Sequence, residues 1–370
     1  MDKQKQSISL FKAFLANLRN LRHSKAILLS YKIGFGAGLL FFLLFLHSYY
    51  ETFYSENTNF EKESVFLHVP TRSNFTDLTK QLNPFLLDTL TFYKAAKKKE
   101  YNSNIKPGKY EIKKGYSNND IINSLRSSNI PINVTFNNIE RLEVLASKIS
   151  KIIEADSVSL MNSFLDKNFL NQNNLNNHSV FAIFLPNTYE FYWNTNANQF
   201  RDKMLKQYNF FWNSTRLQKA ISYGFNPVEV SVLASIVQRE TPKVDERPTI
   251  SGVYFNRLKK RMKLQADPTV IYSIKQKKGF NTKISRVLYK DLRIKSPYNT
   301  YKYKGLPPGP IYMPDISSIE SVLNLENHQY LFFVADVSRP GYHIFAKTNS
   351  QHNRNKRQYI SWLRKNKIKR

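Results

Sequence analysis

The 370-residue chain contains no cysteine, and this absence excludes several classes of functional site. Without thiols there is no disulfide scaffold, no thiolate zinc centre and no cysteine nucleophile. The phosphate-binding loop, the dinucleotide-binding glycine fingerprint and the His-Glu-x-x-His zinc motif are also absent, as is the Gly-x-Ser-x-Gly elbow of serine hydrolases. The sequence therefore offers no support for metal, nucleotide or serine-hydrolase chemistry, and we expect no metal and no cofactor.

Acidic side chains are scarce: 27 Asp and Glu stand against 56 Lys and Arg, which leaves a formal net charge of +29. An excess of this size first suggests a polyanionic partner such as nucleic acid. With 41% hydrophobic and 14% aromatic residues the chain can bury a core, so global disorder is excluded. Its length suggests two or three domains.

One long run, residues 33–50, contains no Lys, Arg, Asp or Glu. It ends in two tyrosines, which is typical of a transmembrane helix with an interfacial aromatic belt. The tail before it, residues 1–32, carries seven basic side chains and one acidic one, so the positive-inside rule places the N-terminus in the cytoplasm. No small-x-small site follows, which favours a single-pass anchor in the inner (plasma) membrane over a cleaved signal peptide. A buried core helix is the other alternative.

This topology changes which partners the positive charge can bind. The tail holds six of the net positive charges, and residues 51–370 hold the other 23 outside the membrane. Cytoplasmic nucleic acid is then out of reach, and we expect no nucleic-acid partner. The polyanions that remain are membrane lipid and an anionic cell-wall polymer. The alternative is that the lysines only cover a solvated surface.

The external part divides into four segments. Residues 51–63 are polar and are interpreted as a stalk. Residues 64–130 and 131–179 each combine β-rich stretches with helical spacing, which predicts a small α+β subdomain and a connecting α+β segment. From 180 to 370 aromatic residues and prolines are dense, and we interpret this segment as a mixed α/β domain. The expected fold class is α+β behind one transmembrane helix.

The end of the last domain shows two further features. Residues 330–334 and 342–346 are predicted to be paired strands with a turn between them. The last twenty residues carry eight basic side chains and no acidic one, interleaved with apolar residues, which predicts a terminal amphipathic helix. His343 lies on one of the strands, where a structural role is more common than a functional one.

Residues 226–242 are the most informative stretch for chemistry. Helical spacing places Glu240 on the same face as the apolar Leu233 and Ile236, near the C-terminal end of the helix. Burial and the negative end of the helix dipole both raise the pKa of such a carboxyl, which prepares it as a general acid. The alternative is a structural Glu, paired for example with Arg247 or Arg257. The helix boundaries are predicted from a capping box and two prolines: Asn226, Pro227, Glu229 and Pro242.

Three loops follow that carry polar groups. In the loop 265–269, Asp267 is either a helix N-cap or a carboxylate of the site. The proline-containing loops 296–301 and 305–311 present tyrosine and asparagine side chains, which suit a sugar chain with apolar ring faces and a fringe of hydroxyls. Simple architecture is the alternative for both loops.

Six motifs occur in order along the C-terminal part: VLASIVQRET (232–241), ERP (246–248), GVYFNRL (252–258), LQADPTV (264–270), SPYNTY (296–301) and GLPPGPI (305–311). Together with LPNTY at 185–189 and the segment 330–335, they closely resemble the YceG-like endolytic murein transglycosylases. The resemblance covers nearly everything after the anchor. Residues 107–125 resemble the LysM-like subdomain of that family, which we assign to 64–130, and 180–370 correspond to its catalytic domain.

The resemblance implies a lyase that cleaves the β-1,4 bond between N-acetylmuramic acid and N-acetylglucosamine within nascent glycan strands. The products would end in 1,6-anhydromuramic acid, and the enzyme would act as a terminase of strand elongation. The catalytic Glu of the family maps onto Glu240. Many relatives have a second Glu where this chain has Gln238, and an Asp where it has Asn187. Weaker candidates for the saccharide cleft are Tyr189, Glu190, Gln265, Asp267, Thr269, Tyr298 and Asn299.

The implied partners are peptidoglycan glycan strands, inner-membrane lipid and peptidoglycan synthases. Three other functions stay open. A hydrolytic muramidase would use Asp267 or Glu190 as a second carboxylate. A non-catalytic wall-binding or divisome scaffold would rely on the LysM-like segment. A polyanion binder would depend on charge and salt and not on Glu240.

Overall fold

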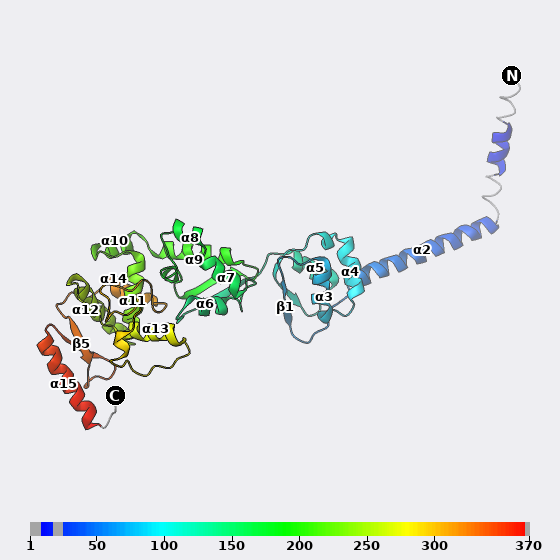
Figure 1. Cartoon of the computed structure of the whole chain (residues 1–370). Coiled ribbons are helices and arrows are strands. Elements are labelled where there is room, and N and C mark those ends of the chain that lie inside the picture. Colours follow the sequence, from blue (N-terminus) through cyan, green and yellow to red (C-terminus); the bar gives the residue numbers. More distant parts are fainter. Residues whose placement is uncertain (1–8, 18–24, 367–370) are drawn as a thin grey trace, which may run out of the picture. The chain divides into compact units, whose positions relative to one another are not determined.

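The computed structural model describes residues 9–17 and 25–366, so parts of the expected cytoplasmic tail and the last four residues lie outside the described residues. The described residues form helices and three two-stranded antiparallel sheets, which confirms the α+β class (Figure 1). Among them no strands pair in parallel, so the C-terminal domain is α+β and not mixed α/β. The chain divides into two compact units, Met1–Ile130 and Pro131–Arg370.

Helix α2 (Lys25–Phe53) contains the expected span. Its residues Leu28–Phe53 are long and apolar enough to cross a membrane, with a mean hydropathy of 1.8. The helix extends beyond the charge-free run at both ends, because Lys32 and Glu51 interrupt the apolar composition but not the backbone hydrogen bonding. At its end Phe53 enters the core of the first unit and is only 4% exposed.

The rest of the first unit is built on one antiparallel strand pair. Its strands are paired from Ser64 opposite Lys113 to Val69 opposite Gly108. Asn74 and Ser117 begin two of its helices with capping boxes. The elements in order are β1 (Ser64–Val69), α3 (Phe75–Leu82), η1 (Asn83–Phe85), α4 (Thr89–Lys98), η2 (Tyr101–Ser103), β2 (Gly108–Lys113) and α5 (Asn118–Arg126).

The prediction of a stalk at 51–63 is wrong. Asn57 and Thr58 are buried, at 3% and 5% exposure. The Asn57 amide donates to the side chain of Asn118 at 2.6 Å and to the backbone oxygen of Asp88 at 2.8 Å. Polar residues are buried here because they satisfy backbone and side-chain groups far away in sequence. This segment is therefore part of the small unit.

The second unit contains one large core that spans both of the segments expected at 131–179 and 180–370. Strand β3 (Pro131–Phe136) pairs antiparallel with β4 (Asn187–Tyr192), and the ring of Phe136 stacks on that of Tyr189 at 5.5 Å. The expected boundary near residue 180 is therefore not a domain boundary. Composition changes there, but strand pairing joins the two sides.

Helices make up most of the second unit. Its helices are α6 (Leu142–Ile149), α7 (Ser157–Phe164), α8 (Lys167–Gln172), η3 (Val180–Ile183), α9 (Ala197–Phe211), α10 (Ser214–Ser222), α11 (Pro227–Glu240), η4 (Val244–Glu246), α12 (Arg247–Lys259), α13 (Asp267–Lys278), η5 (Asp291–Arg293), α14 (Ile316–Leu323) and α15 (Asn349–Lys365). Helix α11 is buried at every residue from Val230 to Val237 and packs against α12, α13 and α14. It is therefore the central helix of the core.

The C-terminal hairpin and helix are present as expected. Strands β5 (Phe332–Ala335) and β6 (His343–Ala346) are paired antiparallel. Helix α15 begins after the N-cap Thr348 and packs against both strands. The predicted amphipathic helix is thus confirmed over the described residues, and it starts two residues earlier than expected.

Candidate active site

Helix α11 carries Glu240 at its last residue. The helix starts as predicted: the Asn226 side chain accepts a hydrogen bond from the Glu229 backbone at 3.0 Å, and the Glu229 carboxylate accepts one from the Asn226 backbone at 2.8 Å. It ends at Glu240 because Thr241, which precedes a proline, is extended at φ −137°. The buried body of the helix therefore fixes the position of this one carboxyl group.

Glu240 is partly buried and borders a cavity. Its Oε1 accepts a hydrogen bond from the Tyr254 hydroxyl at 2.7 Å. Burial raises the pKa of Glu240 from its ordinary value of 4.5 to about 7, and the charge of Asp267 adds to this rise. The hydrogen bond from Tyr254 and the charges of His343 and Arg257 act in the opposite direction. A carboxyl with this pKa can be protonated near neutral pH and can also lose its proton there.

The alternative of a salt-bridged structural Glu is not what the structure contains. The guanidinium of Arg247 pairs with Asp315 at 2.9 Å. Arg257 donates to three backbone oxygens, those of Leu331 at 2.6 Å, Leu264 at 2.7 Å and Lys263 at 3.5 Å. In the described part of the chain, no cation lies within salt-bridge distance of Glu240.

Gln238 does not share this site. Its Oε1 accepts a hydrogen bond from the backbone of Asp315 at 2.6 Å, which turns the side chain toward the start of α14. Glu240 is thus the only carboxylate that the end of α11 presents to the cavity.

Glu240 opens into a polar cavity of about 420 Å³. Tyr254 and Arg257 of α12 lie beside it, and Gln265 and Asp267 lie on the loop that enters α13. The remaining lining comes from Leu264, Tyr301, Phe332, Phe333, Asn349, His352, Asn353 and Lys356. Helices α11, α12 and α13, strand β5 and helix α15 therefore meet at one site.

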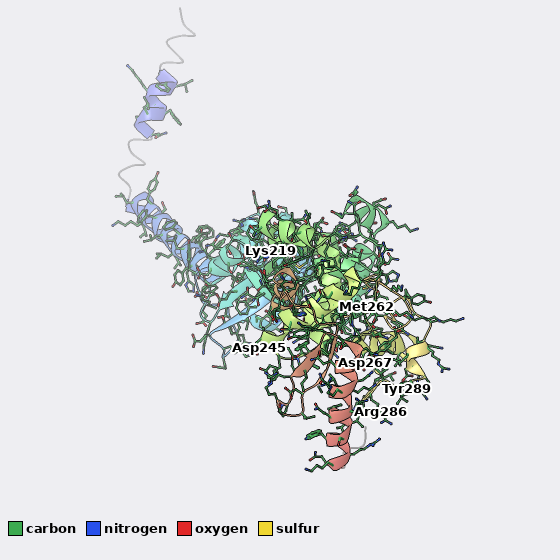
Figure 2. The ribbon with its side chains drawn as sticks, turned by 90° about the vertical axis from the view of Figure 1, so that its left-hand side faces the viewer. Lys219, Asp245, Met262, Asp267, Arg286 and Tyr289 are labelled. Carbon is green, nitrogen blue, oxygen red and sulfur yellow. The ribbon has the colours of Figure 1, made fainter. Side chains whose placement is uncertain are left out.

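Asp267 is the second carboxylate of the cavity. It is exposed, and its Oδ1 accepts a hydrogen bond from the Tyr301 hydroxyl at 2.6 Å. The alternative of Asp267 as a helix N-cap is wrong, because Ala266 occupies the N-cap position and its backbone oxygen accepts from Thr269. Asp267 lines the same cavity as residues of α15, and it lies beside that helix (Figure 2).

Gln265 holds an unusual backbone conformation beside the cavity. Its φ is +51°, in the left-handed region that costs a residue with a side chain about 1 kcal/mol or more. Its backbone N–H donates to the oxygen of Thr300 at 3.2 Å, which fixes this conformation. Gln265 and Asp267 are the two expected saccharide-cleft residues that the structure brings together with Glu240.

Three other candidates are buried and do not line the cavity. Thr269 is fully buried, and its hydroxyl donates to the backbone oxygen of Ala266 at 2.7 Å. Asn299 is also fully buried and donates to the backbone oxygens of Leu292 and Ile294. Tyr298 is 3% exposed. Its hydroxyl lies 3.3 Å from His178. These side chains hold the loops that carry the lining residues.

Two candidates lie elsewhere, on strand β4. Tyr189 is buried in the core, where its hydroxyl donates to the backbone oxygen of Leu185 at 2.8 Å. Glu190 is exposed opposite Asn133 of β3. The structure does not bring either side chain to the cavity.

His343 has the structural role that was expected for it. Its backbone N–H and its Nδ1 contact the two carboxylate oxygens of the buried Glu246, at 2.7 and 2.9 Å. Its influence on Glu240 is electrostatic: the charge of His343 lowers the pKa of Glu240.

Helix α15 supplies lining residues that sequence reasoning missed. Asn349, His352, Asn353 and Lys356 follow each other at helical spacing on one face. The ring of His352 stacks on Phe332 with centroids 5.2 Å apart, and its Nδ1 is buried without a hydrogen-bond partner. Burial and the charges of Lys356 and Arg257 lower the pKa of His352. The helical spacing of these polar residues is visible in the sequence. The sequence does not show that this face of α15 lies toward Glu240.

Comparison with known proteins gives the context of this site. The model of the YceG-like family matches residues 67–358, which include all of the cavity lining. The endolytic murein transglycosylase of Bacillus subtilis is 31% identical over 81% of this chain and 86% of its own length. The protein of the same name from Streptococcus pneumoniae is 27% identical, and the chain spans 59% of it.

A solved structure agrees with this relationship. The crystal structure of a yceG-like protein from Listeria monocytogenes superposes with a TM-score of 0.51 at 25% sequence identity, over 80% of this chain and 99% of that one. The family model, the curated relative and the fold all include the helix that ends at Glu240, and this chain belongs to the YceG-like family.

Proposed function

We propose that this protein is a membrane-anchored lytic endotransglycosylase of peptidoglycan. It cleaves the β-1,4 bond between N-acetylmuramic acid and N-acetylglucosamine and leaves 1,6-anhydromuramic ends. The observation that carries the proposal is Glu240, whose pKa is about 7 at the wall of a polar cavity inside the region of family similarity. The names of the relatives support the same reaction class.

In this mechanism one carboxyl group serves in both steps. Protonated Glu240 donates its proton to the glycosidic oxygen while the bond from that oxygen to muramic C1 breaks. The muramic C6 hydroxyl then attacks C1, and the Glu240 carboxylate accepts the hydroxyl proton. No water is consumed, so no second carboxylate is needed to activate one.

Tyr254 and Asp267 assist Glu240 in different ways. The Tyr254 hydroxyl occupies Oε1, which leaves Oε2 as the oxygen for proton transfer. The negative charge of Asp267 favours the protonated form of Glu240 before cleavage. The Tyr301 hydroxyl holds Asp267 in place.

The saccharide chain would run between the loop 265–267 and helix α15. Gln265, Asn349 and Asn353 offer amide groups to sugar hydroxyls and N-acetyl groups, and Phe332 and Phe333 offer apolar surface to ring faces. Such a combination of amides and aromatic rings suits a carbohydrate that is polar at its edges.

We assign α2 as a single-pass anchor in the plasma membrane, with the N-terminus cytoplasmic and both units outside. The apolar helix and the basic tail support this topology. We also propose that the small unit is the LysM-like subdomain and that peptidoglycan synthases are partners that supply the nascent strands. The strand–helix–helix–strand order of β1, α3, α4 and β2 supports the first of these assignments.

The test is a product analysis with the full-length protein and purified glycan strands. Mass spectrometry should find 1,6-anhydromuramic ends with the unaltered protein and none with Glu240→Gln. Glu229→Gln is the matched control on the same helix, because glutamine also completes a capping box, and it should leave the products unchanged.

Three results would contradict the proposal. Reducing muramic ends in place of anhydro ends would identify a hydrolytic muramidase. Equal cleavage by Glu240→Gln and the unaltered protein would remove Glu240 from the mechanism, and absence of cleavage by either would favour the scaffold.

A further inference from the structure

Helix α4 of the small unit has an exposed face that nothing in the described residues covers. Its inner face is fully buried through Phe92, Ala95 and Ala96. Its outer face consists of Leu90, Lys94, Lys97 and Lys98. They share one side of the helix because Lys94 is four residues after Leu90, and Lys97 and Lys98 are three and four residues after Lys94. We call these four residues the α4 face. Leu90 is 71% exposed, and the three lysines are exposed as well.

The α4 face lies beside the end of α2. The Lys98 Nζ is 5.9 Å from the ring centroids of both Tyr49 and Phe53. Tyr49 belongs to the charge-free run 33–50, whose length of about 27 Å matches the hydrocarbon core of a bilayer. Lys98 is therefore placed at the level where such a helix leaves the membrane. Helix α4 lies beside the end of α2 (Figure 1).

The small unit is joined to this helix without a free linker. Phe53 is part of its core, and the Asn118 amide donates to the backbone oxygen of Thr52 at 3.0 Å. Tyr54 and Glu51 are exposed next to this junction. Because the last turn of α2 is held by the fold, the α4 face cannot move far from the plane at which α2 ends.

We propose that the α4 face binds anionic phospholipid headgroups and holds the small unit against the bilayer. This inference rests on the proposed role of α2 as the membrane anchor, but not on the reaction at Glu240. Lys94, Lys97 and Lys98 contact the phosphates, and Leu90 enters the interfacial region, as in an amphipathic helix that lies in the membrane surface. Each lysine at an anionic surface favours the docked state about fivefold.

The absence of cysteine makes the test direct. The full-length protein with Leu90→Cys, labelled with a fluorophore, is placed in nanodiscs that contain nitroxide lipids. The matched control is Phe66→Cys, at a side chain that is 49% exposed. Its strand, β1, lies on the opposite side of the small unit from α2 (Figure 1). We expect quenching at position 90 and not at 66, and stronger quenching with phosphatidylglycerol than with phosphatidylcholine alone.

A triple variant separates charge from proximity. Lys94→Gln, Lys97→Gln and Lys98→Gln together should reduce quenching at position 90 in phosphatidylglycerol discs to the level in phosphatidylcholine. Equal quenching at positions 90 and 66 would overturn the proposal. Quenching at position 90 that does not depend on the charge of the lipid would also overturn it. A protein that does not enter the discs would overturn it together with the anchor, whereas loss of glycan cleavage would affect only the proposed function.

Discussion

The hydroxyl of Tyr254 stabilises the ionised form of Glu240, because it donates to Oε1 at 2.7 Å. Removing it with Tyr254→Phe should raise the pKa of Glu240 further. A general acid must be protonated, so the fall of kcat/KM on the alkaline side should move to higher pH. The carboxyl would also lose its fixed orientation, and we expect kcat to drop about tenfold.

A pH profile of strand cleavage checks this prediction. Tyr289→Phe is the control, because Tyr289 is 84% exposed and lies outside the cavity lining (Figure 2). An unchanged alkaline limb in Tyr254→Phe, with activity lost at all pH values alike, would mean that Tyr254 only supports the fold.

Glu240 should also cost stability at its working pH. A carboxyl whose pKa is about 7 when folded and near 4.5 when unfolded binds its proton more tightly in the folded state. Its contribution is neutral below about pH 4.5, becomes unfavourable as the pH rises to about 7, and then stays constant at up to about 3 kcal/mol. Glu240→Gln should therefore raise Tm at pH 8 and change it little at pH 4.

Thermal unfolding at both pH values measures this difference. Glu63→Gln is the control, since Glu63 is exposed, and it should leave Tm unchanged at either pH. A Tm of Glu240→Gln that lies below that of the unaltered protein at pH 8 would contradict the burial argument.

Sequence alone could single out Glu240 as a candidate but could not predict its hydrogen-bond donor. The cap, the two prolines and the apolar stripe of α11 are local features, so they predicted where the helix ends and which face its last residue takes. Tyr254 lies fourteen residues later on the next helix, and its contact depends on how α12 packs against α11. Asn299 and Thr269 were expected in the saccharide cleft but are buried. Sequence could not predict this, because their burial depends on loops that are distant in the chain.

Helix α15 contributes four residues to the lining of the cavity at Glu240. His352 has a buried Nδ1 without a hydrogen-bond partner, and burial lowers its pKa, which favours the neutral ring. His352 also lines the cavity, so a substrate hydroxyl or amide that hydrogen-bonds to its ring there would contribute about 1 kcal/mol. We therefore expect His352→Ala to raise KM about fivefold while kcat changes less.

Arg354→Ala is the matched control on α15, because Arg354 is exposed and absent from the cavity lining. Michaelis constants of both variants, measured with glycan strands of defined length, test whether α15 binds the substrate. Equal KM values for His352→Ala and Arg354→Ala would exclude α15 from the substrate site.

Capped helices and paired strands were the elements that sequence predicted best. The prediction of a stalk failed, because Asn57 and Thr58 have the composition of a linker. Only the structure shows that they form hydrogen bonds with Asn118 and Gly115. Hydrogen bonds that join residues about sixty positions apart leave no periodic pattern in a sequence.

The two units have separate hydrophobic cores. One contains buried residues from Phe53 to Leu125, and the other contains buried residues from Val134 to Leu323. All residues that line the cavity of Glu240 belong to the second unit. A fragment of residues 131–370 should therefore fold by itself and carry the complete chemical site.

We expect this fragment to unfold cooperatively and to cleave soluble glycan strands with a kcat within about twofold of the full-length protein, since no catalytic group is lost. Circular dichroism and the product assay measure both properties, and the same fragment with Glu240→Gln serves as the inactive control. A folded fragment that produces no anhydro ends would mean that the small unit, or the membrane surface that α4 contacts, takes part in the reaction. In that case the first unit would have a second role beyond anchoring, because it would help to bring the glycan strand to Glu240.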